Sequence, residues 1–291
     1  MKEQILELNL KNSFELNHIF DCGQCFRWNK EDDGSYTGVF KGNVLNVQKN
    51  GDIVIFKGIC KGNIEDICRE YFDLDTNYEE IKNILSKVDN NLKESIKYGE
   101  GIRILKQDLW ETIISFIISA NNNIPRIKKI IERISKEYGE KIIWNGEEYY
   151  TFPNPQSLSK ASVEDLRALG LGFRDKRVYE TTRMILNKEI DLEKLQEIKD
   201  SNVLREELNK LPGVGDKVAD CIMLFSMKRF DVFPVDVWVR RVMNELYIKN
   251  EDESKVDKKQ IRSLAESKYG NLAGIAQQYL FYWKREENKT A

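Results

Sequence analysis

Apolar and polar residues alternate in the first part of the chain, whereas apolar residues follow a helical period further on. The alternation runs through residues 35–58, where residues 49–52 (Lys-Asn-Gly-Asp) are typical of a hairpin turn. Residues 6–10 and 25–28 are strand-like as well. This pattern predicts an antiparallel sheet in the N-terminal third of the chain.

Helical spacing begins after that sheet. It predicts a helix over residues 63–72, and from residue 78 onward the pattern is helical, broken by a loop at residues 149–157 that contains Pro153 and Pro155. No internal repeat or low-complexity tract is evident. A sheet first and helices afterwards predict an α+β fold.

A glycine-rich turn at residues 211–215 (Leu-Pro-Gly-Val-Gly) joins two of the predicted helices. These helices cover residues 202–210 and 216–228, which makes the segment a helix-hairpin-helix. Gly213 and Gly215 can adopt positive φ at no steric cost. The amides of such a turn and the N-terminus of the second helix are donors suited to a phosphate. An ordinary glycine-rich helix connection is the alternative.

A lysine follows the hairpin directly. Asp216 is suited to cap the second helix, which places Lys217 in its first turn. The helix dipole disfavours an ammonium there, and burial would lower the pKa of Lys217 further, towards a free amine that can attack a sugar C1′ and form a Schiff base. Cys221 lies at i+4 on the same helix face. A solvated lysine that contacts phosphate and a small buried cysteine are the simpler alternatives.

The next helix begins with a carboxylate. The Pro234-Val235-Asp236 step precedes an amphipathic run from Val237 to Leu246, so Asp236 is predicted to be the N-cap. A capping carboxylate is rigidly positioned, as stabilisation of positive charge on a sugar requires. The structural and the chemical roles are compatible.

The formal charge is nearly balanced over the 291 residues. The net charge is −2, with −5 in the first 100 residues and +3 in the remainder. Basic clusters at residues 126–129, 174–177, 228–229 and 240–241 lie close to the motifs. A hairpin that binds phosphate through backbone amides needs few cationic side chains, so this balance does not exclude nucleic acid.

Composition also indicates the compartment. A charged content of 32% and the lack of an apolar run near 18 residues argue against a membrane span. The N-terminus lacks the apolar core of a signal peptide, and five cysteines, an odd number, fit a reducing compartment. We therefore expect a soluble intracellular protein, in the cytoplasm or nucleoid, with no membrane partner.

Other catalytic chemistries have little support. Cys22 and Cys25 form a C-x-x-C pair, but Cys60 and Cys68 are separated by seven residues, which fits zinc-ribbon patterns poorly. His18 is the only histidine, so neither a Ser-His-Asp or Cys-His site nor a histidine metal cluster is supported. Lysine chemistry remains, and no metal site is predicted.

Six short segments are distributed along most of the chain: GQCFRW at 23–28, SANNNIPRI at 119–127, LGLGFR at 169–174, LPGVGDKVADC at 211–221, FPVDV at 233–237 and AQQYLF at 276–281. In this order they resemble the 8-oxoguanine DNA glycosylase branch of the helix-hairpin-helix, Gly/Pro-Asp (HhH-GPD) superfamily of base-excision repair enzymes. The resemblance spans nearly the whole chain. It implies a TBP-like antiparallel β domain over residues 1–95 and an α-helical HhH-GPD domain over residues 96–291.

The resemblance implies a role for each residue of the base pocket. Lys217 would be the nucleophile, and Asp236 would stabilise positive charge on the sugar. The excised base would lie between Phe281 and Cys221, with Gln277 on its Watson–Crick edge.

Gly23 would distinguish the damaged base. By the resemblance, its carbonyl accepts the N7–H that 8-oxoguanine has and guanine lacks. Guanine would set two acceptors against each other and leave a buried carbonyl unpaired.

The resemblance also implies contacts with the duplex around the vacated position. Asn121 would fill the gap, and Arg126 and Arg174 would read the opposite cytosine. Two positions depart from the pattern of the better-known eukaryotic relatives: Phe173 stands in place of a wedging tyrosine, and Trp238 in place of a histidine near the DNA backbone. Stacking survives the change to phenylalanine, but a hydroxyl contact does not, which leaves opposite-base discrimination open.

The implied function is that of a bifunctional DNA glycosylase. The damaged nucleotide leaves the duplex, Lys217 displaces 8-oxoguanine, and the resulting imine cuts the strand by β-elimination. The partner would be double-stranded DNA containing 8-oxoguanine, bound by a monomer through contacts that include Gly213 and Gly215. A monofunctional glycosylase for alkylated bases and a non-catalytic helix-hairpin-helix module are the alternatives.

We expect no cofactor for this reaction. The iron–sulfur cluster of the endonuclease III branch would need cysteines in the C-terminal tail, and none occurs after Val242. A monovalent cation at the hairpin backbone is left open.

Overall fold

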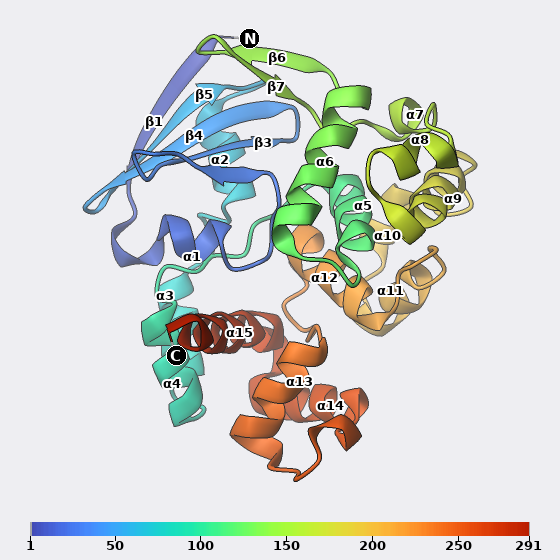
Figure 1. Cartoon of the computed structure of the whole chain (residues 1–291). Coiled ribbons are helices and arrows are strands. Elements are labelled where there is room, and N and C mark those ends of the chain that lie inside the picture. The colour runs from blue at the N-terminus through green and yellow to red at the C-terminus, as the bar shows by residue number, and fades with distance from the viewer. Residues whose placement is uncertain (1, 291) are drawn as a thin grey trace.

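The computed structural model describes residues 2–290 and begins with a five-stranded antiparallel sheet (Figure 1). The strand order is β1-β5-β4-β3-β2. The predicted antiparallel sheet and the α+β fold are therefore confirmed. The strands are β1 (Glu3–Asn9), β2 (Trp28–Lys30), β3 (Tyr36–Phe40), β4 (Asn43–Asn50) and β5 (Ile53–Ile59).

The predicted turn between β4 and β5 is also confirmed. Asn50 pairs with Ile53, which leaves a two-residue loop in which Gly51 has φ +60°. The prediction of a strand from residue 25 was wrong for its first three residues, since β2 begins at Trp28. The side chains of Cys25 and Phe26 instead enter two different hydrophobic clusters, so this segment bridges them rather than pairing as a strand.

Four helices accompany the sheet: α1 (Leu16–Phe20), α2 (Ile64–Tyr71), α3 (Tyr78–Leu85) and α4 (Asn90–Tyr98). The helix predicted over residues 63–72 is α2, which Asn63 caps by accepting the amides of Glu65 and Asp66. Aromatic rings fill the core under the sheet, where Phe20 stacks on Trp28 at 4.3 Å between centroids.

The helical part of the chain is organised around α5 (Leu109–Ser119), which is buried almost all round. It packs against α12 (Asp216–Met227) and α6 (Ile124–Tyr138), while α15 (Ala273–Thr290) returns along α4 (Figure 1). The other helices are α7 (Pro155–Leu158), α8 (Val163–Ala168), α9 (Asp175–Leu186), α10 (Leu192–Glu197), α11 (Ser201–Leu208), α13 (Val237–Met243) and α14 (Lys258–Tyr269).

One prediction for this part was wrong. Residues 141–150 form a hairpin, β6 (Lys141–Trp144) and β7 (Glu147–Tyr150), where helix was expected. The Asn145-Gly146 step supplies the two positive φ values of its turn. Trp144 packs against Val39, Val44 and Ile59, so the hairpin belongs to the core of the N-terminal sheet.

The boundary between residues 95 and 96 stays a prediction. Tyr78, Leu85 and Leu92 share a hydrophobic cluster with the C-terminal helices, whereas Leu105 belongs to the cluster under the sheet. The chain therefore crosses between the two cores more than once. Within residues 2–290, no helix has both the length and the apolar character needed to cross a membrane.

Candidate active site

The hairpin at residues 211–215 separates α11 from α12, as predicted. Gly213 has φ +85°, and a Cβ there would lie 2.6 Å from Cδ of Arg177, so only glycine fits. Gly215 does not use positive φ: it is the extended N-cap of α12 (φ −110°, ψ 178°), and a Cβ on it would meet open space. A phosphate can therefore approach the amides at the start of α12.

The predicted cap at Asp216 was wrong, because Gly215 occupies the N-cap position. Asp216 is the first residue of α12, and its carboxylate accepts hydrogen bonds from Asn209 (2.8 Å) and Arg262 (2.9 Å). The bond from Asn209, followed by that from Arg262, lowers the pKa of Asp216 despite partial burial. Lys217 still lies in the first turn of the helix.

Lys217 is half-buried at the wall of a cavity. Its Nζ lies 5.5 Å from the centroid of the Phe116 ring on α5. Cys221 and Asp236 are close enough to act on its charge. The ammonium, ring, thiol and carboxylate thus form one local cluster.

The influences on the pKa of Lys217 differ from those predicted from the sequence. The pKa of Lys217 is raised, first by the ionised form of Cys221 and less by Asp236, while burial lowers it. Burial raises the pKa of Cys221 itself to about 11. Near pH 7 the thiol is therefore uncharged, and burial is then the largest remaining influence on Lys217. In that pH range burial favours the free amine.

Asp236 is the N-cap of α13, as predicted. Its carboxylate accepts a hydrogen bond from the amide of Val239 at 2.7 Å. Pro234 and Val235 before it are buried, so the backbone that carries Asp236 is fixed on both sides. The carboxylate is held at the cavity wall without needing a partner side chain.

The cavity has a volume of about 650 Å³ and collects residues from distant parts of the sequence. The loop at residues 21–25 contributes Gly23, and the connection between α5 and α6 contributes Asn121. Helices α5, α6, α12, α13 and α15 also contribute side chains to its lining. Six of the predicted site residues line it: Gly23, Asn121, Lys217, Asp236, Trp238 and Phe281.

Two predicted pocket residues lie behind this lining. Cys221 and Gln277 are each 4% exposed and do not line the cavity. The amide oxygen of Gln277 accepts a hydrogen bond from Gln278 at 2.8 Å. That bond fixes the orientation of the Gln277 amide.

Gly23 and Phe281 are direct neighbours. Gly23 has φ +88°, and a Cβ on it would lie 3.7 Å from Cε1 of Phe281. The loop backbone therefore approaches the aromatic ring closely. The structure brings together these two residues from opposite ends of the chain, as the resemblance implies.

The two arginines predicted to read the opposite base have different environments. Arg174 is only 2% exposed, and its guanidinium donates to the carbonyls of Ala120 (2.8 Å) and Asn121 (2.7 Å). It braces the loop that carries Asn121, whose φ is +50°. Arg126 is exposed and donates to the Gly170 carbonyl at 3.3 Å.

Phe173 lies beside Arg174 and Arg177 and is 55% exposed. The guanidinium carbons of Arg174 and Arg177 lie 4.2 and 5.2 Å from its ring centroid. An exposed ring supported by two cations suits insertion beside a base.

Sequence reasoning missed several residues of the cavity. Phe116 and Arg285 belong to it, and the exposed side chains of Ile124 and Val237 form an apolar part of its lining. Only the i+4 spacing of Arg285 after Phe281 could have indicated its place. The Trp238 indole N–H is buried and has no hydrogen-bond partner in the described part of the chain.

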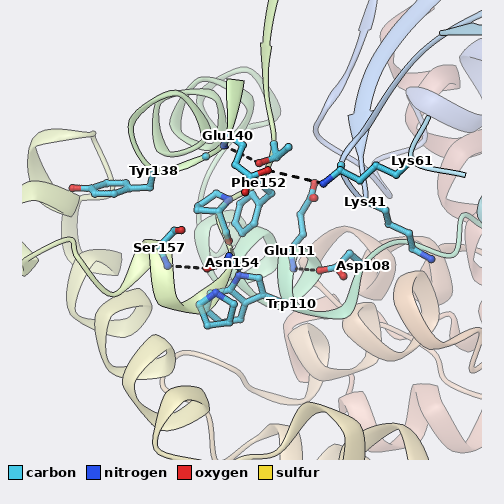
Figure 2. A pocket seen from close by; sticks show the side chains of 15 residues that line it. Lys41, Lys61, Asp108, Trp110, Glu111, Tyr138, Glu140, Phe152, Asn154 and Ser157 are labelled. Carbon is cyan, nitrogen blue, oxygen red and sulfur yellow. Dashed lines mark hydrogen bonds and ion pairs between the residues drawn. The ribbon is translucent and has the colours of Figure 1, made fainter. Parts of the chain in front are cut away.

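A second cavity of about 320 Å³ lies at the other end of α5 (Figure 2). Lys61 and Glu140 form a 4.0 Å ion pair across it, and Asp108 caps α5 through the amide of Glu111. Burial raises the pKa of Glu111 to about 7, although Arg27 opposes this. None of the predicted site residues lines this cavity.

The histidine and the cysteines have structural environments. Nδ1 of His18 accepts the amide of Gly101 at 3.2 Å, and its ring lies 5.2 Å from that of Tyr282. Burial raises the pKa of Cys22 to about 11. Within residues 2–290, no group of three or more His, Cys, Asp or Glu side chains is suited to a metal ion.

Two sequence families match the chain one after the other. "8-oxoguanine DNA glycosylase, N-terminal domain" matches residues 6–113. "HhH-GPD superfamily base excision DNA repair protein" matches residues 114–269, which include the hairpin, Lys217 and Asp236.

Individual proteins are similar over most of their length. A probable N-glycosylase/DNA lyase of Methanothermobacter thermautotrophicus is 36% identical over 72% of this chain and 71% of its own. The N-glycosylase/DNA lyase of Saccharomyces cerevisiae is 30% identical over 93% of this chain and 83% of its own. The crystal structure of Clostridium acetobutylicum 8-oxoguanine glycosylase/lyase with double-stranded DNA containing cytosine opposite 8-oxoguanine is 45% identical, covers 98% of both chains and has a TM-score of 0.91.

Proposed function

Since the chain belongs to the 8-oxoguanine glycosylase/lyase family of HhH-GPD base-excision repair proteins, we propose that it excises 8-oxoguanine from duplex DNA and then nicks the abasic strand. The observation that carries this proposal is the shared cavity. Lys217 and Asp236 line it together with Gly23 and Phe281. A nucleophile and a base-reading surface therefore face the same space.

In the proposed reaction the damaged nucleotide first leaves the base stack, because C1′ is inaccessible inside the duplex. The free amine of Lys217 attacks C1′, the bond from C1′ to the base breaks, and the base leaves with a proton. The remaining proton on the Lys217 nitrogen then passes to O4′ as the C1′–O4′ bond breaks, which opens the sugar ring and gives an imine. Removal of a proton from C2′ then breaks the C3′–O bond, and water releases Lys217 from the cleaved strand.

Asp236 supports two of these steps. Its carboxylate stabilises the positive charge that develops on the sugar as the base leaves. It also compensates the positive charge on the Lys217 nitrogen after attack. The helix cap holds the carboxylate in place, so little reorganisation is needed during the reaction.

The base would be read on the other side of the cavity. We propose that the Gly23 carbonyl accepts the N7–H of 8-oxoguanine, while the ring stacks on Phe281 and packs against Cys221. The Gln277 amide would meet the Watson–Crick edge once the base has entered. Guanine lacks the N7–H, so its entry would leave the Gly23 carbonyl unpaired.

Double-stranded DNA would lie across the cavity mouth. The hairpin amides at Gly213 and Gly215 would bind a phosphate of the damaged strand, and Trp238, which lines the cavity, would lie near the DNA backbone. Asn121 would fill the vacated position, with Phe173 stacking beside the opposite base. Arg126 would contact that base, and Arg174 would reach it only by releasing a carbonyl of the Asn121 loop.

We propose that the monomer carries out this chemistry without a resident cofactor. Lys217 supplies the nucleophile and Asp236 the negative charge, so no metal-bound water or iron–sulfur cluster is required. A monovalent cation could still join the hairpin to a phosphate: the Leu211 carbonyl accepts the amide of Val214 at 3.0 Å and keeps a second lone pair. If no metal-bound water takes part, the rate of excision should be the same with and without EDTA.

Borohydride trapping tests the proposal. The protein should form a covalent complex with a duplex containing 8-oxoguanine opposite cytosine, and Lys217→Gln should abolish it. Lys97→Gln is the matched control, because Lys97 is exposed on α4 and pairs with Glu94. Absence of a trapped species, or trapping that survives Lys217→Gln, would overturn the proposed mechanism. Release of 3-methyladenine without trapping would favour a monofunctional glycosylase.

A further inference from the structure

Arg285 lies on α15 one turn beyond Phe281 and lines the same cavity. Neither the nucleophilic attack nor the contacts proposed for the base use it. Its side chain is 17% exposed, so it is not a freely solvated arginine.

The guanidinium joins α15 to the loop that carries Gly23. Nη2 donates to the carbonyl of Asp21, two residues before Gly23. Nη1 lies 3.5 Å from the position that a Cβ on Gly23 would occupy. Arg285 therefore contacts the loop on both sides of Cys22.

The same guanidinium covers two aromatic rings of α15. Its central carbon lies 5.4 Å from the Phe281 centroid and 5.7 Å from that of Tyr282. Glu286 accepts from Nε at 3.2 Å and from Nη2 at 3.1 Å, which fixes the plane of the group. The rings and this carboxylate hold the guanidinium between the loop and the helix.

In the part of the chain that the structure describes, no backbone–backbone hydrogen bond holds Gly23 in place. Gly23 has positive φ and lies in a segment without regular structure, so its carbonyl direction depends on what holds the loop. Gln24 anchors the other end of this loop by donating to the carbonyls of Ile19 and Arg103. Arg285 supplies the anchor on the side of α15.

We propose that Arg285 is a positioning residue for damaged-base specificity. By holding the Asp21–Cys25 loop against Phe281, it sets the distance between the carbonyl that accepts N7–H and the ring on which the base stacks. This inference rests on the proposed function, which assigns the base to that space. It concerns base release only, because nicking of an abasic site involves no base in the pocket.

The experiment measures two activities of the full-length protein under single-turnover conditions. The first is release of 8-oxoguanine from a duplex with cytosine opposite, and the second is nicking of a duplex with a preformed abasic site. Arg285→Met should slow base release about tenfold, the loss expected for hydrogen bonds to a charged group. Nicking of the abasic duplex should stay within about twofold of the wild type. Arg285→Lys should recover part of the base release by retaining a donor for the Asp21 carbonyl.

Arg183→Met is the matched control. Arg183 also donates to one carbonyl, that of Ser159, and its guanidinium lies 5.1 Å from the Tyr179 ring, but it belongs to α9 and does not line the cavity. This variant should leave both activities unchanged. An effect equal to that of Arg285→Met would overturn the inference.

The remaining outcomes are equally decisive. If Arg285→Met slows both activities together, the residue stabilises the fold rather than the specificity, and the inference fails. It also fails if neither activity changes while the wild type releases 8-oxoguanine. A wild type that releases no 8-oxoguanine and forms no trapped complex instead contradicts the proposed function.

Discussion

The two sides of the active cavity are built in different ways. The proposed reacting side, Lys217 and Asp236, lies on two consecutive helices, and each residue takes its position from a helix start. The proposed reading side, Gly23, Gln277 and Phe281, comes from a loop near one end of the chain and a helix at the other. Short-range rules thus position the proposed nucleophile and carboxylate, whereas a long-range contact positions the residues proposed to read the base.

This difference means that the two sides can be disabled separately. Base release needs both, because the base must be held while its bond to the sugar breaks. Nicking of a preformed abasic site needs the reacting side and the DNA contacts alone. The ratio of the two activities therefore reports which side a substitution has damaged.

The largest effect is expected on the reacting side, from Asp236→Asn. Asparagine is as good an N-cap as aspartate, so α13 should persist while the negative charge is lost. Base release should fall about a hundredfold, because the positive charge on the sugar loses its fixed counter-charge. Nicking of abasic duplex should fall as well, since Asp236 also compensates the charge on Lys217. Single-turnover rates on both duplexes measure this.

Asp257→Asn provides the control for this prediction. Asp257 caps α14 by accepting the amide of Lys259, and it does not line the cavity. The same change there should alter neither rate. Loss of base release with full retention of nicking in Asp236→Asn would contradict the assignment of Asp236 to the reacting side.

A smaller effect is expected on the reading side, from Gly23→Ala. An alanine at φ +88° is strained by roughly 1–2 kcal/mol, and the loop must shift to relieve it. Base release should slow about tenfold while nicking of an abasic duplex is retained. Gly34→Ala is a matched control, because Gly34 has φ +86° and open space around a Cβ. If both variants behave alike, general strain rather than base reading explains the loss.

The reacting side was the more predictable of the two. The Asp236 cap follows from the order of residues before an amphipathic run, and the structure confirms it. The cap at Asp216 was predicted wrongly because its carboxylate is engaged by Asn209 and Arg262, and the Arg262 partner lies on a distant helix. Local spacing cannot reveal such a tertiary partner.

The fold class could be predicted from periodicity, but not every element. The β6–β7 hairpin was missed although the Asn145-Gly146 step indicates a turn, because its strands are short and surrounded by helical patterns. On the proposed reading side, the residues were predicted from the family resemblance alone. The position of Arg285 could not be predicted, because it depends on how α15 packs against the loop that carries Gly23. Burial of Arg174 likewise depends on the path of the Asn121 loop.

The two arginines proposed to face the DNA are expected to affect different properties. Arg126→Met should reduce the preference for cytosine opposite the lesion about fivefold without changing thermal stability, because its side chain is exposed.

Arg174→Met should instead lower the melting temperature, since the carbonyls of Ala120 and Asn121 lose a buried hydrogen-bond donor. Four duplexes, one for each opposite base, and a thermal melt separate these results. A stable Arg174→Met variant with altered base preference would show that Arg174 contacts the opposite base rather than stabilising the loop that carries Asn121.

The smallest effect is expected at Cys221, which lies behind the cavity lining and close to Lys217. Burial raises the pKa of its thiol to about 11, so between pH 6 and pH 9 it carries no charge that could stabilise the ammonium of Lys217. The rate of abasic nicking should rise with pH as Lys217 loses its proton. In Cys221→Ala this rise should move by less than about 0.3 pH unit, while base release slows about threefold from the lost contact with the base.

A thiolate–ammonium pair would give the opposite result. Removing a negative charge beside Lys217 would lower the pKa of the amine, and the rise in nicking rate would move to lower pH by about one unit or more. That outcome would place Cys221 on the reacting side. An unmoved pH profile combined with slower base release would place it on the reading side, as a packing surface for the base. Rates measured on both duplexes across this pH range, with wild type alongside, decide between the two.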